Sequence, residues 1–237
     1  MRHTTPRPDF AGSTAHEKAT LISFYRPIQI SLRIAVALVC LSGFAASVRA
    51  QDVFKPPPPV TYTEKYEAYL GASFLNGQAG QNLPKRINMG GGEAMATYYV
   101  APRIGPAVDF RYEWGTTPVL PNSNNIPTRP VVYQTIGMVG AQYRGYRTQR
   151  FAINYHAFAG VSALKTTNDL NGVPPAQVGL YTNRVKPMAT VGGSIDINRS
   201  ARLAIRIAPD MVFEHFGNET REFFSMSGGV IYRFGHR

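Results

Sequence analysis

The chain has 237 residues, of which 44% are hydrophobic and 16% charged, which is ordinary for a protein that folds and allows one β domain or two smaller units. The formal net charge is +11, but the sequence shows no nucleic-acid-binding motif, so we expect no nucleic acid as a partner. Thirteen Tyr, thirteen Phe and 22 Gly favour β-structure, because aromatic side chains suit a pleated surface and Gly marks turns or crowded strand positions.

The first 50 residues have the pattern of a secretory signal peptide. Arg26 and Arg33 precede a mostly apolar run over 34–46, and "VRA" at 48–50 predicts cleavage after Ala50. The alternative is a transmembrane anchor, which needs about twenty apolar residues, and this run is shorter. We therefore predict residues 1–50 as a cleaved signal peptide and export of the rest.

The exported part begins with a proline-rich segment. Residues 51–65 contain "PPPP" at 56–59, which predicts a stiff polyproline leader to the domain, on the periplasmic side. Cys40, the single cysteine, lies in the part predicted to be removed, so no disulfide or thiol chemistry is expected in the mature chain. We assign residues 66–237 to one β domain.

Eight segments of this domain alternate apolar and polar side chains with the period of a β-strand, and no helical period competes. They are 66–75, 88–100, 107–114, 131–143, 151–163, 185–197, 202–214 and 222–234. Long connections at 76–87, 115–130 and 164–184 alternate with short ones at 101–106, 144–150 and 198–201, and a middling one spans 215–221. In an up-and-down meander alternate connections emerge at opposite ends, so we expect one plain end and one elaborate end.

The third segment, "AVDFRYEW" at 107–114, shows how the two faces differ. After Ala107, its odd-numbered positions are charged and its even-numbered positions are apolar or aromatic, so one face is charged and the other is bulky. A soluble barrel would put the apolar face inside, and a membrane barrel would put it outside. An eight-stranded barrel has an interior just wide enough for side chains, so the face rich in small and polar residues is expected inside.

The same reasoning predicts a charged interior. Opposite charges in a confined lumen can pair, whereas an Arg or Lys facing lipid at mid-bilayer costs about 2–4 kcal/mol. The expected structural charge network consists of Glu67, Glu93, Asp109, Arg111, Glu113, Lys186, Asp196, Arg206, Asp210, Glu214 and Arg233. Aromatic girdles at the strand ends are predicted from Tyr66, Tyr98, Tyr112, Trp114, Tyr143, Phe151, Phe213, Phe223 and Tyr232.

This architecture, with the closing strand "GGVIYRFGHR" at 228–237, resembles the small outer-membrane β-barrels of the OmpA/OmpX type over about residues 62–237. The resemblance implies an all-β, eight-stranded, antiparallel up-and-down transmembrane barrel in the outer membrane of a Gram-negative bacterium. It also implies surrounding outer-membrane lipid and lipopolysaccharide, insertion by the outer-membrane assembly machinery, and a monomer. In that setting the Arg residues of the short connections would lie beside anionic phospholipid of the inner leaflet: Arg103, Arg144, Arg147, Arg150 and Arg199.

Catalytic chemistry has one candidate arrangement. His215 follows Glu214, and Ser225 and Ser227 lie in the next predicted strand, but the serines alternate inward and no deacylase motif surrounds them. His156 is expected to be a hydrogen-bonded interior residue. "TTNDLNG" at 166–172 lacks a calcium-loop pattern. We therefore predict no catalytic residue, metal site or cofactor.

Two functions from different classes remain. The first is a non-enzymatic outer-membrane protein whose long loops contact an unknown extracellular partner, with a role in envelope integrity, adhesion or recognition. The second is a lipid-modifying hydrolase that resembles a lipid A deacylase. A porin is a weaker third possibility, because eight strands leave no open lumen.

Overall fold

The computed structural model describes residues 59–81, 83–121, 129–167, 170–182, 184–217 and 219–236. The predicted signal peptide at 1–50 and the first part of the predicted leader, 51–58, lie outside the described residues. None of the described helical residues forms an apolar segment of membrane-crossing length.

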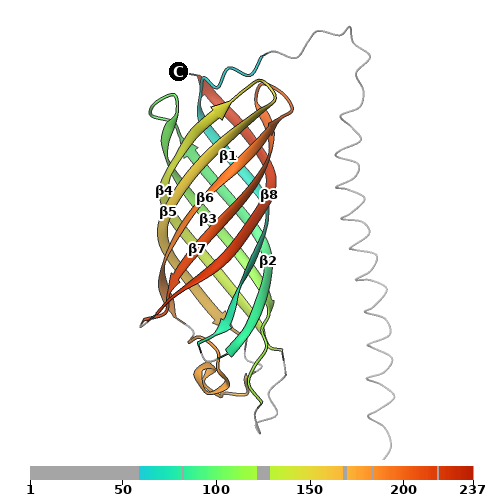
Figure 1. Cartoon of the computed structure of the whole chain (residues 1–237), viewed down its shortest axis with the longest axis vertical. Helices are drawn as coiled ribbons and strands as arrows, with labels where there is room; N and C mark the ends of the chain where they lie inside the picture. Colours follow the sequence, from blue (N-terminus) through green and yellow to red (C-terminus); the bar gives the residue numbers. More distant parts are fainter. Residues whose placement is uncertain are drawn as a thin grey trace, which may run out of the picture. The chain divides into compact units, whose positions relative to one another are not determined.

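Eight strands form a closed antiparallel barrel in sequence order (Figure 1). They are β1 (Glu64–Gly80), β2 (Leu83–Tyr98), β3 (Ile104–Thr116), β4 (Val131–Arg147), β5 (Phe151–Thr166), β6 (Val185–Asn198), β7 (Leu203–His215) and β8 (Thr220–His236). β8 closes the barrel on β1, with Tyr66 opposite Phe234. Closure leaves no unpaired strand edge, which is the condition for a sheet to cross a bilayer. The predicted eight-stranded up-and-down barrel is confirmed.

The strands are longer than the alternation predicted, and one predicted connection is wrong. β1 and β2 continue through the supposed long loop 76–87, with Gly77 opposite Ile87, so only residues 81–82 connect them. The polar, Gly-rich composition of this stretch imitates a loop. Backbone pairing to the neighbouring strand keeps it in the sheet, because a ladder hydrogen bond does not depend on the side chain.

The connections make the two ends of the barrel unequal. The plain end carries the short connections 99–103, 148–150 and 199–202, together with the first described residues and the end of β8 (Figure 1). The loop end carries 81–82, 117–130, 167–184 and 216–219. The third of these contains a short 3-10 helix, η3 (Pro175–Val178). The predicted contrast therefore holds, with two long connections in place of three.

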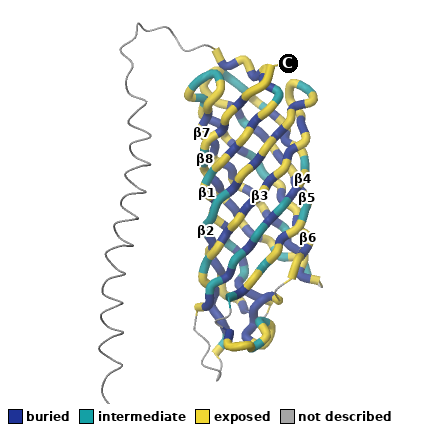
Figure 2. Tube along the Cα trace, turned by 180° about the vertical axis from the view of Figure 1, so that it is seen from behind, coloured by how far each residue is buried: buried dark blue, intermediate teal, exposed yellow. Residues whose placement is uncertain are grey.

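Exposed and buried residues alternate along the strands (Figure 2). Successive side chains of a strand point to opposite faces, which here are the outer wall and the lumen. In β3, Phe110 and Trp114 are 53% and 52% exposed, whereas Asp109 and Glu113 are buried. Large apolar side chains cover most of the outer wall, including Leu70, Val139, Tyr155, Val191, Ile207 and Val230, whereas β2 contributes only Tyr98. The apolar face therefore lies outside and the charged face inside.

Phe223 corrects the predicted aromatic girdles. It is buried, and a Cβ atom placed on Gly77 would lie 1.6 Å from its ring, so the ring fills the space above that glycine. Its neighbour Phe224 takes the outward position. Phe223 was assigned to a girdle because it lies near the end of a strand. The two-residue period of the strand, however, directs its side chain into the lumen.

Candidate functional site

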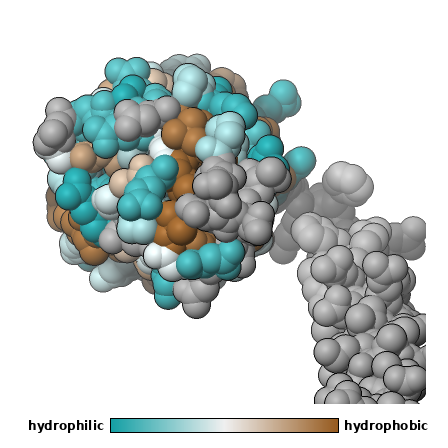
Figure 3. Space-filling model, turned by 90° about the horizontal axis from the view of Figure 1, so that it is seen from below, coloured by the Kyte–Doolittle hydropathy of each residue, from teal (hydrophilic) through white to brown (hydrophobic). Residues whose placement is uncertain are grey.

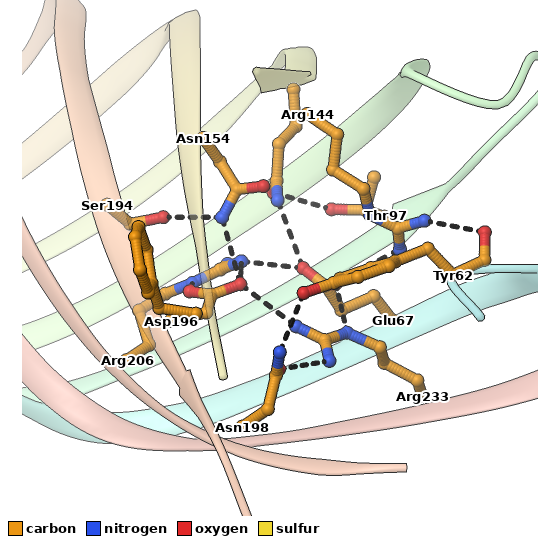
Figure 4. Close-up of polar contacts among 12 residues, drawn as sticks. Tyr62, Glu67, Thr97, Arg144, Asn154, Ser194, Asp196, Asn198, Arg206 and Arg233 are labelled. Carbon is orange, nitrogen blue, oxygen red and sulfur yellow. Dashed lines mark hydrogen bonds and ion pairs between the residues drawn. The ribbon is translucent and has the colours of Figure 1, made fainter. Parts of the chain in front are cut away.

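The candidate site is the lumen, which holds charged groups at three levels. The level nearest the plain end is the Glu67 cluster, made of Glu67, Arg144, Asp196, Arg206 and Arg233 (Figure 4). Arg206 lies at its centre: its Nε is 2.7 Å from Asp196 Oδ1 and its Nη2 is 2.7 Å from Glu67 Oε1. Arg233 joins the same two carboxylates, at 3.2 Å from Glu67 and 3.1 Å from Asp196. Five strands contribute these groups, so the cluster ties opposite walls together.

Neutral side chains add hydrogen bonds to the carboxylates of the Glu67 cluster. Gln142 Nε2 donates to Glu67 Oε1 at 3.0 Å, and Asn154 Nδ2 donates to Asp196 Oδ2 at 2.9 Å. Donors of this kind offset the cost of burying a carboxylate. The sequence prediction included the charged residues and missed these amides, because an Asn or Gln on an inward face carries no distinctive pattern.

Arg144 is the charged residue that the sequence analysis misplaced. It was expected in a short connection at the membrane surface, but it lies in β4 and is fully buried, with its guanidinium carbon 3.6 Å from the Tyr99 ring centroid. Its Nη2 is 3.3 Å from Glu67 Oε2. The period of β4 continues inward through Gln142 to Arg144, and extending that alternation by one step would have found it.

The middle level is the Arg111 cluster, made of Glu93, Asp109, Arg111, His156 and Asp210. Arg111 Nη2 lies 2.6 Å from Asp210, 2.9 Å from Asp109 and 3.5 Å from Glu93. His156 Nε2 is 2.7 Å from the other oxygen of Asp210, which confirms the expected hydrogen-bonded interior histidine.

Glu113 comes next along β3 from Arg111 on the inward face. It is fully buried but lies outside the salt bridges of Arg111. The structure therefore brings Glu93, Asp109 and Asp210 around one guanidinium and leaves Glu113 beside them.

The third level, nearest the loop end, is mostly apolar. Lys186 Nζ is 4.0 Å from Glu214 Oε1, and the other contacts of Glu214 are hydrogen bonds from Ser162 and Gln134. Lys186 also lies 4.1 Å from the centroid of the Phe216 ring, a cation–π distance. The predicted interior residues of this level therefore form one loose pair.

An apolar cap closes the lumen above that pair; it consists of Leu180, Tyr181, Phe216 and Phe223. The Tyr181 and Phe216 rings are stacked with centroids 3.6 Å apart, and Phe216 contacts Phe223. Burial raises the pKa of Tyr181 to about 12, so its phenol stays neutral. The cavity beneath the cap measures about 20 Å³, room for about one water molecule. Viewed onto the loop end, apolar surface lies among hydrophilic residues (Figure 3).

The residues of the candidate hydrolase arrangement are not assembled. His215 is exposed, with Nδ1 3.1 Å from the Thr220 hydroxyl, whereas Glu214 points into the lumen. Ser225 accepts a hydrogen bond from Arg111, and Ser227 accepts one from Tyr69. Among the described residues, no group of His, Asp and Glu side chains could hold a metal ion.

No family model and no curated protein matches the chain. Similar solved structures include Ail, the attachment invasion locus protein of Yersinia pestis, with 14% identity over 71% of this chain and 97% of that one and a TM-score of 0.45. Neisserial surface protein A has 11% identity over 72% and 97%, with a TM-score of 0.49. OprG from Pseudomonas aeruginosa has 9% identity over 73% and 98%, with a TM-score of 0.47.

These identities and scores are too low to carry an argument, so the assignment rests on this chain's own strand pairing and exposure. Its barrel is closed, its outer wall is apolar, and its charged side chains are buried in the lumen. An apolar outer wall is stable in lipid and costly in water, because water would have to hydrate its many large apolar side chains. The chain is a closed, eight-stranded, antiparallel β-barrel with an apolar outer wall, which is the architecture of a transmembrane β-barrel.

Proposed function

We propose that the protein is an integral outer-membrane protein of a Gram-negative bacterium, with a non-enzymatic role in envelope integrity, adhesion or surface recognition. In this proposal the barrel is a rigid anchor. The long connections at the loop end, 117–130 and 167–184, contact an extracellular partner.

One observation carries the proposal: the lumen is filled by side chains that pair with one another. Arg111, Arg206 and Arg233 are fully buried and engaged with carboxylates. A solute path would need a wet, open lumen, and a catalytic group would need access to substrate. A filled interior supports a role for the barrel as a rigid scaffold. The loop end is then the surface through which the protein would contact a partner.

Outer-membrane lipid and lipopolysaccharide surround the barrel in this proposal. The closing strand β8 carries outward Tyr232 and Phe234 near its end, which suits recognition by the outer-membrane assembly machinery. In this proposal the protein is a monomer, as the resemblance to the small outer-membrane barrels implies.

Heat-modifiability tests the membrane part of this proposal. Protein refolded in detergent should migrate on a gel at a different position from boiled protein, because a closed barrel resists the detergent until heated. Equal migration, together with solubility in the absence of detergent, would contradict an outer-membrane barrel and favour a soluble, lipocalin-like protein.

The second candidate, a lipid-modifying hydrolase, depends on the exposed His215 near the loop end. Refolded protein should release no fatty acid from lipid A, and His215→Ala should behave as the parent does. Release by the parent that is lost in His215→Ala would support the hydrolase and overturn the non-enzymatic role.

A further inference from the structure

Residues 59–63 precede β1 and take no part in the barrel ladder, yet they are fixed to the plain end. Val60 and Tyr62 are 7% and 5% exposed and pack with Ala152 in a small apolar cluster. The side-chain amide of Gln149 makes two hydrogen bonds to the backbone of Val60. Val60 N donates to Gln149 Oε1 at 2.7 Å, and Gln149 Nε2 donates to Val60 O at 3.2 Å. This segment is bound to a turn that is far away in sequence.

Tyr62 makes the central contacts of the segment. Its hydroxyl donates to Thr148 O at 2.7 Å and accepts a hydrogen bond from Asn198 Nδ2 at 2.6 Å. Arg144 Nη1 donates to the backbone oxygen of Tyr62 at 3.2 Å. Figure 4 shows the side chain reaching across the Glu67 cluster toward Asn198. The connection 148–150 and the end of β6 are therefore joined through one phenol.

The Tyr62 ring lies over two arginines of the Glu67 cluster, Arg144 and Arg233, and near Arg147 outside it. The guanidinium carbons of Arg233, Arg144 and Arg147 lie 5.1, 5.5 and 5.7 Å from its centroid. These are cation–π distances, and such contacts strengthen when water is excluded. Arg144 and Arg233 are almost fully buried, and the ring is part of what separates them from solvent.

The backbone of Tyr62 is strained. Its φ is +56°, in the left-handed region that a residue with a Cβ atom adopts at a cost. Such a conformation persists only where the surroundings over-determine it, and at Tyr62 the hydrogen bonds and the ring contacts do so. A segment that served only to lead into β1 would have no reason to keep it.

We propose that residues 59–63 are a strap that seals the plain end of the barrel, with the Tyr62 ring as its plug. The apolar cap closes the loop end, and the strap closes the opposite end over the Glu67 cluster. Because the anchors of the strap lie on connection 148–150 and at the end of β6, it can dock only after the barrel has brought these two parts of the chain together. Releasing it exposes the arginine-lined floor of the lumen to water while the ladder stays intact.

Labelling of cysteines introduced into the lumen tests the strap. The parent is the full chain with Cys40→Ser, and Ser194→Cys places a buried thiol beside the Glu67 cluster. A small water-soluble thiol reagent should react with this cysteine about tenfold faster when Tyr62→Ala is added, since local opening sets the rate. Thr61→Ala is the matched control, because Thr61 is exposed and bonds only the neighbouring Thr63. It should leave the rate unchanged.

A second reporter shows whether the opening is local. Ser162→Cys lies in the lumen near the apolar cap, and Tyr62→Ala should not change its labelling. Tyr62→Phe keeps the ring and loses the hydroxyl, so its Ser194→Cys rate should stay within about twofold of the parent.

Three results would overturn the proposal. In the first, Tyr62→Ala folds, as its heat-modified gel position shows, and labels no faster than Thr61→Ala. In the second, labelling at Ser194→Cys and Ser162→Cys rises equally, which means that the whole barrel has loosened. In the third, Tyr62→Ala does not fold, which means that the strap is inseparable from the barrel.

Discussion

The two ends of the lumen are closed by opposite chemistry within one barrel. At the plain end, Arg206 and Arg233 bridge Glu67 and Asp196 under the Tyr62 ring. At the loop end, stacked aromatic rings close over the single Lys186–Glu214 pair, whose 4.0 Å separation is longer than a hydrogen bond. The strand number sets the width of the lumen at both ends, but it does not set what fills it.

Because of this difference, a substitution at one end should change the stability of the barrel for a different reason than a substitution at the other. A buried ion network loses several partners when one charge is removed, because every remaining charge stays in a poorly solvated place. An apolar layer loses only the contacts of the atoms removed and the energy of the cavity left behind. The plain end should therefore be the more sensitive to a change of charge, and the loop end to a change of volume.

The largest expected effect is that of Arg206→Leu. It leaves Asp196 and Glu67 without their central guanidinium, and the free energy of unfolding should fall by about 3–5 kcal/mol. Denaturation in lipid vesicles measures it, with the exposed Arg202→Leu as matched control. A change near zero would show that the lumen is wet and that the network contributes little.

Phe223→Ala tests the loop end by volume. Removing a buried ring beside Gly77 and Phe216 should lower the free energy of unfolding by about 3 kcal/mol, the lower end of the range for such a truncation, because the cap can partly collapse. Phe224→Ala, one residue further and facing lipid, is the control and should cost clearly less. Equal losses in both variants would mean that the apolar cap is not a packed layer.

A pair of double variants compares the ends directly. Lys186→Met with Glu214→Gln should change the free energy of unfolding by about 1 kcal/mol or less, since two neutral side chains replace a loose ion pair and no charge is left unpaired. Arg206→Met with Glu67→Gln should stay far below the parent, because Asp196 and the remaining arginines still lose partners. Similar outcomes for the two double variants would remove the contrast between the ends.

Epitope insertion should have the smallest effect on stability, and it tests which end of the barrel faces the outside of the cell. A short epitope inserted between Asn122 and Asn125 should be labelled on intact cells with little loss of stability, since long surface connections tolerate insertion. The same epitope between Ser200 and Ala201, in a short connection of the plain end, should be labelled only after the outer membrane is opened. The reverse pattern would mean that the loop end faces the periplasm.

The sequence predicted the faces of the strands better than their ends. A period of two residues is a local property, so the placement of Asp109, Arg111 and Glu113 follows from alternation alone. The end of a strand depends on whether a neighbour continues to pair, and the misassigned connection 76–87 and the misplaced Arg144 both lie where pairing continues past the clear pattern.

For this protein the sequence by itself determined the barrel, the number of strands, the direction of each face and the charged content of the lumen, because all of these follow from the spacing of side chains along the chain. Only the tertiary structure decided which charges meet. Glu67 and Arg206 are 139 residues apart, and Tyr62 and Asn198 are 136 apart. The stagger of eight closed strands brings such positions to one level, and that stagger arises from pairing around the whole ring, which no single segment encodes.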